Sequence, residues 1–330
     1  MVSIFNASKS VVLVVLFIYT ILINLNLYIY PPTIDIQVTA PLSKLILDGL
    51  QAISNGQSYI LTTIFIMLML MQAAMLNYLV DRHKLLSTYT SLPAFCYVLL
   101  ISLFNEHLFL SPPFLANFAV LVALAQVYSS YNNNSFTQPF DVGLAIGIAS
   151  LFYLPVLILT IFALLALNIT RVFNWRESLV SVIGVLIPYL FLGTFYFVTD
   201  GFSGFIAAQF GQIHTTITNI PINYPEIIIK ATIILFIVML AMFFFQSHFF
   251  KSIVKIRKLL TILVHLLSIS ILIFLFMEQF SLAPMALLAI PLSIFLAYSF
   301  FEIDHKLTAE SIHLTLLGVL LLFQYGKTLL

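Results

Sequence analysis

The chain has 330 residues, of which 62% are hydrophobic and 8% are charged, and its formal net charge is +1. Because soluble domains carry about 25% charged residues, this composition excludes a water-soluble surface and predicts an all-α, polytopic transmembrane helical bundle. The near-neutral charge gives no basis for binding nucleic acid. No shift in composition marks a linker, so residues 1–330 are expected to form a single integral membrane domain.

The first membrane span is predicted over residues 11–30, after Lys9 and before Pro31–Pro32. This run has the length of about 20 apolar residues that a span needs, and it lacks the cleavage site of a signal peptide, so we expect it to be retained. Eight further single spans are predicted at residues 59–80, 92–104, 113–128, 179–198, 227–245, 259–276, 282–300 and 312–323.

The apolar stretch 142–170 is longer than the other runs and is interrupted by Pro155. As one helix it would measure about 44 Å, which exceeds a hydrocarbon core of about 30 Å. It would also separate Arg171 and Arg176 from the other basic loops. Two short segments that meet near Tyr153 avoid both problems, so we expect a buried hairpin or re-entrant pair and about 11 membrane segments in all.

Small residues recur four positions apart in the first half of this stretch, as Gly143 and Gly147 and as Ala145 and Ala149. Such residues let helix backbones approach closely in a membrane. They therefore predict that the hairpin packs tightly among other helices.

The distribution of lysine and arginine predicts the orientation, because cytoplasmic loops carry an excess of these residues. We expect a cell inner-membrane protein with its N-terminus in the cytoplasm and its C-terminus in the periplasm. Ten of the thirteen basic residues then lie on the cytoplasmic side, namely Lys9, Arg82, Lys84, Arg171, Arg176, Lys251, Lys255, Arg257, Lys258 and Lys306.

Two sizeable loops, residues 31–56 and 199–226, are expected on the outer face. In the first of them, apolar residues recur at helical spacing within residues 41–53. This pattern predicts a short helix that lies in the membrane interface. Its apolar face is predicted to consist of Leu42, Leu45, Ile46 and Leu50.

The outer loops also hold the candidates for chemistry. A carboxylate near the membrane can act as general base on an acceptor hydroxyl, and a cation can offset a phosphate. Asp35 follows the first span closely, and Glu106–His107 lies in a very short loop. We predict Asp35, Glu106 and His107 as catalytic candidates, with Lys44 and His214 near a lipid phosphate. The alternative is that these loops are polar only because they meet water.

The inner face suggests mainly structural roles. Asp141 is expected to cap the first helix of the hairpin, and Arg171 and Arg176 are expected to anchor the chain at the membrane surface with the tryptophan between them. The basic loop 248–258 is typical of a contact with anionic lipid.

Histidines raise the question of a metal site. Before the last span lie Glu302, Asp304, His305, Glu310 and His313. Only one Glu-x-x-His pair is present, so we expect a solvated loop and no metal. His265 lies within a span, where we expect it to bond a carbonyl. No cofactor is expected, since the sequence has no Walker, GxSxG or HExxH motif.

The stretch 140–188, with Gly143, Gly147 and Pro155 followed by Gly184 and Pro188, resembles an uncharacterised family of polytopic inner-membrane proteins from Bacteroidota. It also remotely resembles the GT-C superfamily of polyprenyl-phosphate-dependent glycosyltransferases, which often carry a glycine-rich pair of short helices. In that superfamily an acidic residue lies in the first outer loop beside an interfacial helix. Asp35 and residues 41–53 occupy these places here.

The GT-C resemblance implies an envelope-biogenesis enzyme that transfers a sugar from a polyprenyl-phosphate carrier on the outer face, with Asp35 as base. One alternative is a non-catalytic subunit or scaffold of an envelope or secretion complex, which would have membrane-protein partners. A small-molecule or lipid transporter comes third, because the chain has a single broken helix pair and almost no charge within its spans. Membrane lipids are expected partners in each case.

Overall fold

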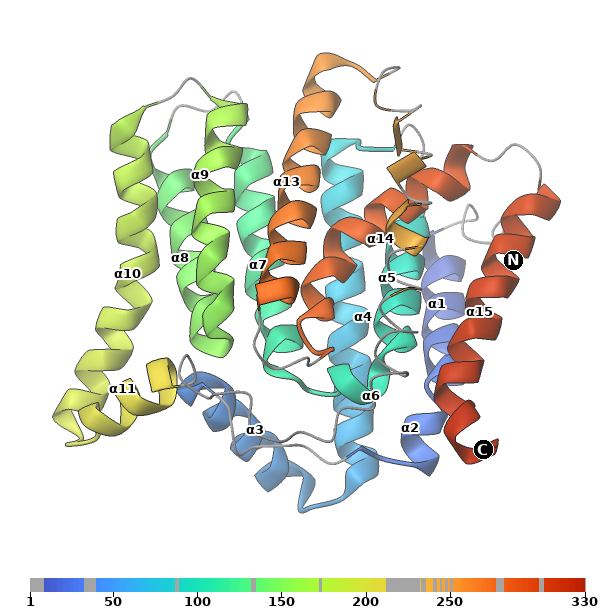
Figure 1. The fold of residues 1–330 in the computed structure, drawn as a ribbon, viewed down its shortest axis with the longest axis horizontal. Coiled ribbons are helices and arrows are strands. Elements are labelled where there is room, and N and C mark those ends of the chain that lie inside the picture. Colours follow the sequence, from blue (N-terminus) through green and yellow to red (C-terminus); the bar gives the residue numbers. More distant parts are fainter. Residues whose placement is uncertain are drawn as a thin grey trace.

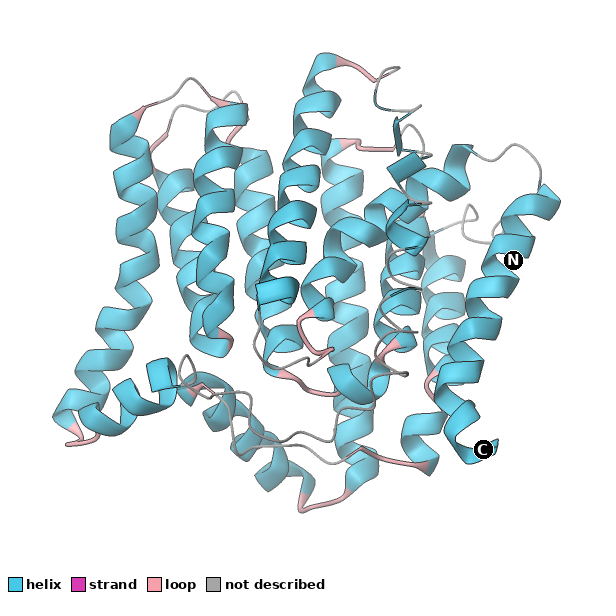
Figure 2. Ribbon diagram, viewed as in Figure 1, coloured by secondary structure: helices cyan, strands magenta, loops and turns pink. Residues whose placement is uncertain are grey.

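The computed structural model describes residues 9–32, 40–86, 89–131, 135–171, 174–211, 252–276, 282–302 and 306–329, with isolated positions between 232 and 249. Within these ranges every regular element is a helix (Figure 2), which confirms the all-α prediction. The elements are α1 (Lys9–Ile23), α2 (Asn26–Ile29), α3 (Pro41–Ser54), α4 (Ser58–His83), α5 (Leu92–Leu103), α6 (Asn105–Leu108), α7 (Pro112–Ser129), α8 (Thr137–Phe152), η2 (Leu154–Ile158), α9 (Leu159–Thr170), α10 (Trp175–Val198), α11 (Phe202–Phe210), α13 (Val254–Phe276), α14 (Met285–Glu302) and α15 (Lys306–Leu329).

The longer helices run side by side, while α3 and α11 lie across one end of the bundle (Figure 1). We call this the α3 end, and it also holds α6 and the turn between α10 and α11. The opposite end, called the α13 end, holds the end of α4, the beginning of α8 and the beginning of α13. The chain therefore places the predicted outer loops at one end and the predicted inner loops at the other.

Four helices of the described part are long and apolar enough to cross a membrane: α4, α7, α10 and α13. Five shorter apolar helices accompany them, at Val14–Ile23, Leu92–Leu103, Leu154–Thr170, Met285–Phe301 and Glu310–Tyr325. Four is fewer than the eleven segments predicted, because several of the other predicted segments correspond to these shorter helices, and one of them is divided by a break. The predicted span at 227–245 falls largely outside the described residues.

The first predicted span shows such a break. It divides into α1, which ends at Ile23, and α2, which begins at Asn26. The side chain of Asn24 donates from Nδ2 to the carbonyl of Thr20 at 2.9 Å. Asparagine amides of this kind compete with the helical backbone pattern, and a continuous helix over 11–30 was therefore the wrong expectation.

The chain reverses between α8 and α9, as predicted for residues 142–170. The helix α8 ends at Phe152, and the short helix η2 leads into α9. The far ends of the pair meet, since Arg171, directly after α9, donates from Nη2 to Oε1 of Gln138 in α8 at 3.0 Å. The end of α7 joins them, because the Ser130 and Thr170 hydroxyls lie 3.0 Å apart. Asp141 lies inside α8, which begins at Thr137, so the expectation that it caps this helix was wrong.

The glycines of α8 pack against α10. A Cβ atom at Gly143 would overlap the carbonyl oxygen of Ser181, and one at Gly147 would lie 2.5 Å from the carbonyl oxygen of Val185. From the other side, a Cβ at Gly184 would overlap the carbonyl oxygen of Phe140. The predicted close approach is therefore confirmed, and its partner is α10.

The core is centred on α5, all of whose residues from Leu92 to Leu103 are buried. A chain of hydrogen bonds crosses it: Tyr97 donates to Gln72 Oε1 at 2.6 Å, and Asn117 Nδ2 lies 3.2 Å from the Tyr97 hydroxyl and 2.7 Å from the Ala286 carbonyl oxygen. Gln72 Nε2 in turn donates to the Phe114 carbonyl at 2.8 Å. These bonds tie α4, α5, α7 and α14 together inside apolar surroundings, where an unmet polar group is costly.

Two histidines have structural partners. His265 Nδ1 lies 2.7 Å from the carbonyl oxygen of Thr261, which confirms the expected carbonyl bond. His313 is buried within α15 and its Nε2 lies 3.0 Å from the Tyr19 hydroxyl. The expectation that His313 belongs to a solvated loop was therefore wrong, because α15 begins before it at Lys306.

Candidate functional site

The structure brings two of the predicted site elements to the α3 end. Lys44 is exposed on α3, and the backbone of Glu106 and His107 forms the middle of α6 (Figure 1). Asp35 and His214 lie outside the described residues. The catalytic and phosphate-binding assignments therefore stay predictions, with α3 and α6 as their scaffold.

The structure confirms a helix at the position predicted for the interfacial one, α3, and this helix presents three different faces. Ser43 and Leu47 are buried against the bundle. Leu45 and Ile53 are 58% and 70% exposed, so a second, apolar face points away from the protein. A helix that meets protein on one side and offers apolar side chains on another is suited to the surface of a membrane.

The predicted apolar face of α3 is partly exposed, and a further leucine of this helix is buried. Leu47 is the most buried residue among its leucines and isoleucines, although it lies outside the predicted set, whereas the predicted Leu45 is exposed. The third face carries Lys44 and Asp48, which are both exposed and four residues apart on the helix. The side chains of Lys44 and Asp48 therefore lie beside one another, and neither occupies the buried face or the exposed apolar face of α3.

Side chains from α3 and α11 donate hydrogen bonds to backbone carbonyl groups at the end of α8. The last carbonyl groups of a helix have no partner within it. Ser43 Oγ donates to the carbonyl oxygen of Phe152 at 2.7 Å, and Gln209 Nε2 donates to that of Ser150 at 3.0 Å. Tyr189 adds a bond from its hydroxyl to Ser150 Oγ at 2.8 Å. The helix α8, at 16 residues, is only about 24 Å long, so these bonds cover an end that an apolar environment would otherwise penalise.

A buried amide cluster holds α6 in place. Asn105, the first residue of α6, donates from Nδ2 to Asn24 Oδ1 at 3.2 Å. Asn24 Nδ2 donates to Ser102 Oγ at 2.8 Å, and Gln324 Nε2 donates to the Ser102 carbonyl at 2.9 Å. The cluster thereby joins the break after α1, the end of α5 and the helix α15. It fixes the backbone that carries Glu106.

The turn after α6 is strained. Leu110 has φ 47° and is fully buried. This left-handed conformation costs a residue other than glycine about 1–2 kcal/mol, and strained residues gather at functional sites. Ser111 follows and caps α7, since its Oγ accepts from the Phe114 N–H at 3.4 Å.

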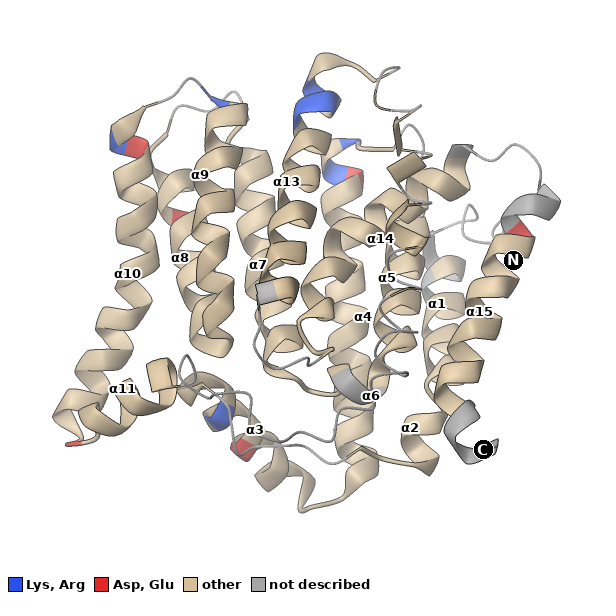
Figure 3. Ribbon diagram, viewed as in Figure 1, with Lys and Arg blue, Asp and Glu red and all other residues tan. Residues whose placement is uncertain are grey.

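The charges divide unevenly between the two ends (Figure 3). At the α13 end, Arg171 is the best-connected cation. It donates to the carbonyl oxygens of Ser130 and Ser135 at 3.1 Å and 2.9 Å, and it pairs with Glu177 at 3.1 Å. Its side chain is only 4% exposed, so it is a buried tie between loops rather than the surface anchor that we predicted.

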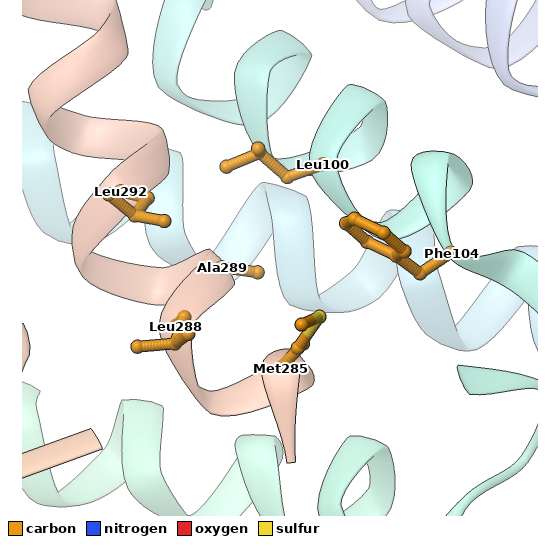
Figure 4. A pocket seen from close by; sticks show the side chains of 6 residues that line it. All are labelled: Leu100, Phe104, Met285, Leu288, Ala289 and Leu292. Carbon is orange, nitrogen blue, oxygen red and sulfur yellow. The ribbon is translucent and has the colours of Figure 1, made fainter. Parts of the chain in front are cut away.

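The described residues contain a small pocket but no metal cluster. No group of three histidine, cysteine or acidic side chains there could hold a metal ion. A small pocket of about 20 Å³ lies between α5 and α14 (Figure 4). The residues that line it are all of apolar types, namely Leu100, Phe104, Met285, Leu288, Ala289 and Leu292. A cavity of this size holds about one water molecule, which is too little for a sugar or a lipid.

Comparison with known protein families assigns the chain to one family. A family model matches residues 33–329, which include every described helix from α3 to α15. The chain belongs to DUF6427, a family of unknown function. This confirms the expected membership of an uncharacterised family over most of the chain. No curated protein and no solved structure matches.

Within this DUF6427 chain, sequence reasoning missed the residues that position the α3 end. Asn24, Asn105 and Gln209 are polar residues within or beside apolar runs, and that placement is a signal that each needs a partner. Their partners on other helices could not be named, because they lie 59 to 81 residues away along the chain.

Proposed function

We propose that the protein is an integral inner-membrane protein of cell-envelope biogenesis that acts on a polyprenyl-phosphate-linked sugar at the α3 end, in the manner of the GT-C superfamily. One observation carries the proposal. The helix α3 with its exposed Lys44 and the helix α6 with Glu106–His107, which precedes the strained turn at Leu110, share one end of a membrane-type bundle (Figure 1). Along the chain, Asp35 lies between α2 and α3.

The proposed step is a displacement at the anomeric carbon of the sugar. Asp35 takes the proton from an acceptor hydroxyl, whose oxygen forms the new bond to that carbon. The bond from the carbon to the phosphate oxygen breaks, and the negative charge stays on the polyprenyl phosphate. Lys44 and His214 offset this charge, while Glu106 or His107 assists the acceptor. The apolar face of α3, with Leu45 and Ile53, lies along the lipid.

Replacing Asp35 by asparagine tests the step. A general base contributes about 10²–10⁴-fold to a rate, so Asp35→Asn should remove most of the glycan product at unchanged protein level. Cells without the gene are complemented with each variant, and their lipid-linked sugars and envelope glycans are compared by mass spectrometry. Asp48→Asn is the matched control, because Asp48 is an exposed carboxylate on α3 with no role in the step.

The proposal fails if cells without the gene keep all their glycans. It also fails if product persists after neutralisation of all the predicted outer carboxylates, which are Asp35, Asp48, Glu106, Asp200, Glu226 and Glu278.

We also propose the orientation that the chemistry needs, with eleven membrane segments, the α3 end in the periplasm and the α13 end in the cytoplasm. The excess of basic residues at the α13 end supports it. A membrane-impermeant maleimide should label Asp48→Cys but not Lys84→Cys in cells with a permeable outer membrane. Both positions are exposed, and the native Cys96 is buried and gives a silent background. Labelling of position 84 alone would invert the assignment.

A second candidate, a non-catalytic subunit of an envelope complex, rests on α10. Only 22% of the most apolar stretch of this helix is buried within the protein. Its exposed face includes Leu186, Leu190, Phe191 and Phe195. Stoichiometric co-purification of one envelope protein, lost on Phe191→Ser, would favour this role.

A further inference from the structure

The α13 end carries cations that the chemistry proposed for the α3 end does not use. Lys255 and Lys258 each hold Nζ 5.7 Å from the centre of the Tyr131 ring. Both lysines belong to the first turns of α13, whereas Tyr131 follows the end of α7. We call these three side chains the Tyr131 cluster. A ring beside an ammonium group stabilises it by a cation–π interaction.

The end of α4 adds further positive charge to the same region. Arg82 and Lys255 are both close enough to His83 to interact with it electrostatically. The His83 ring packs edge-on against Tyr128, with 5.2 Å between ring centres, and the Tyr128 hydroxyl donates to the Leu259 carbonyl at 3.2 Å. These contacts fix the end of α4 beside the beginning of α13.

The cluster lacks an internal counter-charge among the described residues. Neither Lys255 nor Lys258 has a described carboxylate within 4.0 Å. The Nε of Arg257 is buried there without an acceptor in the described part of the chain. Cations held close together repel one another, and an anion between them would relieve that repulsion.

The surroundings indicate what kind of anion fits. Ile253 and Val254, which directly precede Lys255, are 66% and 60% exposed. Exposed apolar side chains next to exposed lysines suit a molecule with a charged head and an apolar tail. A free phosphate would use the charges but would leave the apolar residues in water.

We propose that the Tyr131 cluster binds the phosphate headgroup of an anionic membrane lipid, with Lys255 and Lys258 on the phosphate and the acyl chains along Ile253 and Val254. The site is distinct from the α3 end and independent of any transferase activity. Basic clusters between membrane helices are known to take such headgroups.

The test is a lipid titration of the full-length protein in neutral detergent, followed by native mass spectrometry. Phosphatidylglycerol should bind more tightly than phosphatidylcholine. Each basic residue at an anionic surface is worth about 1 kcal/mol, so Lys255→Gln with Lys258→Gln should weaken phosphatidylglycerol binding about 30-fold. Lys255→Arg with Lys258→Arg should retain it, and Arg176→Gln, which removes an exposed cation that stacks on Trp175, should leave it unchanged.

Three results would overturn the proposal. One is equal binding of phosphatidylcholine, which would show that the charge of the headgroup is not recognised. Another is full competition by millimolar inorganic phosphate, which would identify a site for a soluble anion. The third is unchanged phosphatidylglycerol affinity in the double glutamine variant. Because both lysines are exposed, this variant should keep the thermal stability of the native protein, and that measurement excludes unfolding as a cause of lost binding.

Discussion

Replacing Gly143 by alanine is expected to destabilise the protein by about 3 kcal/mol or more, which is the upper end of the usual range for overpacking. The added Cβ overlaps the backbone carbonyl oxygen of Ser181, and backbone cannot turn aside as a flexible side chain can. The helix α10 must therefore move away from α8, which carries its main contacts. The measurement is the temperature at which the detergent-solubilised protein loses its monodisperse peak in size-exclusion chromatography.

The control for this change is Gly318→Ala in α15, where an added Cβ meets nothing within 4 Å. Alanine is favoured over glycine within a helix by about 0.5–1 kcal/mol, so Gly318→Ala should be neutral or slightly stabilising. The two substitutions are chemically identical, and the structure predicts opposite signs for them. A shift of the same sign and size in both would contradict the packing of α8 on α10.

Replacing Arg171 by glutamine is expected to cost about 3–5 kcal/mol, because it breaks a buried ion pair and leaves Glu177 without its partner. The carbonyl oxygens of Ser130 and Ser135 also lose their donors. Arg171→Lys should recover only part of the loss, since an ammonium group cannot reproduce the fork of the guanidinium. The same thermal measurement applies.

Arg176 supplies the comparison for this position, because it is exposed and lies in the same connection between α9 and α10. Arg176→Gln and Arg176→Lys should each change stability by less than about 0.5 kcal/mol. If Arg171→Lys were as stable as the native protein, the hydrogen bonds of the Arg171 guanidinium would not contribute to stability as predicted.

Local patterns in the sequence were sufficient for several elements. Continuous apolar runs gave most of the helices, and Pro155 located the reversal between α8 and α9. The spacing of leucines predicted the helix α3, which ends at Ser54. The paired glycines predicted a close contact between helices. Each of these features depends on residues within a few turns of one another, so a linear pattern contains the information.

Other features depend on contacts between distant parts of the chain. The charge of Arg171 indicated a loop at the membrane surface, but its burial follows from Ser130, Ser135 and Gln138, which lie 33 to 41 residues before it. Hydropathy likewise gave no sign that α10 would be the partner of Gly143. For the candidate site, the distribution of basic residues placed Lys44 and Glu106–His107 on one face, while the asparagines that fix α6 became apparent only from the fold.

The bonds that cover the end of α8 also have a consequence for the order in which the protein matures during synthesis. Ser43 is made before the hairpin, and it is available as soon as Phe152 leaves the ribosome. Gln209 is made 59 residues after Ser150, its hydrogen-bond partner. At the roughly 5–20 residues per second of translation, the Ser150 carbonyl therefore lacks its hydrogen bond from Gln209 for several seconds. The hairpin therefore reaches its final arrangement only once α11 has been made, and a ribosome stalled before Gln209 would hold it in an immature state.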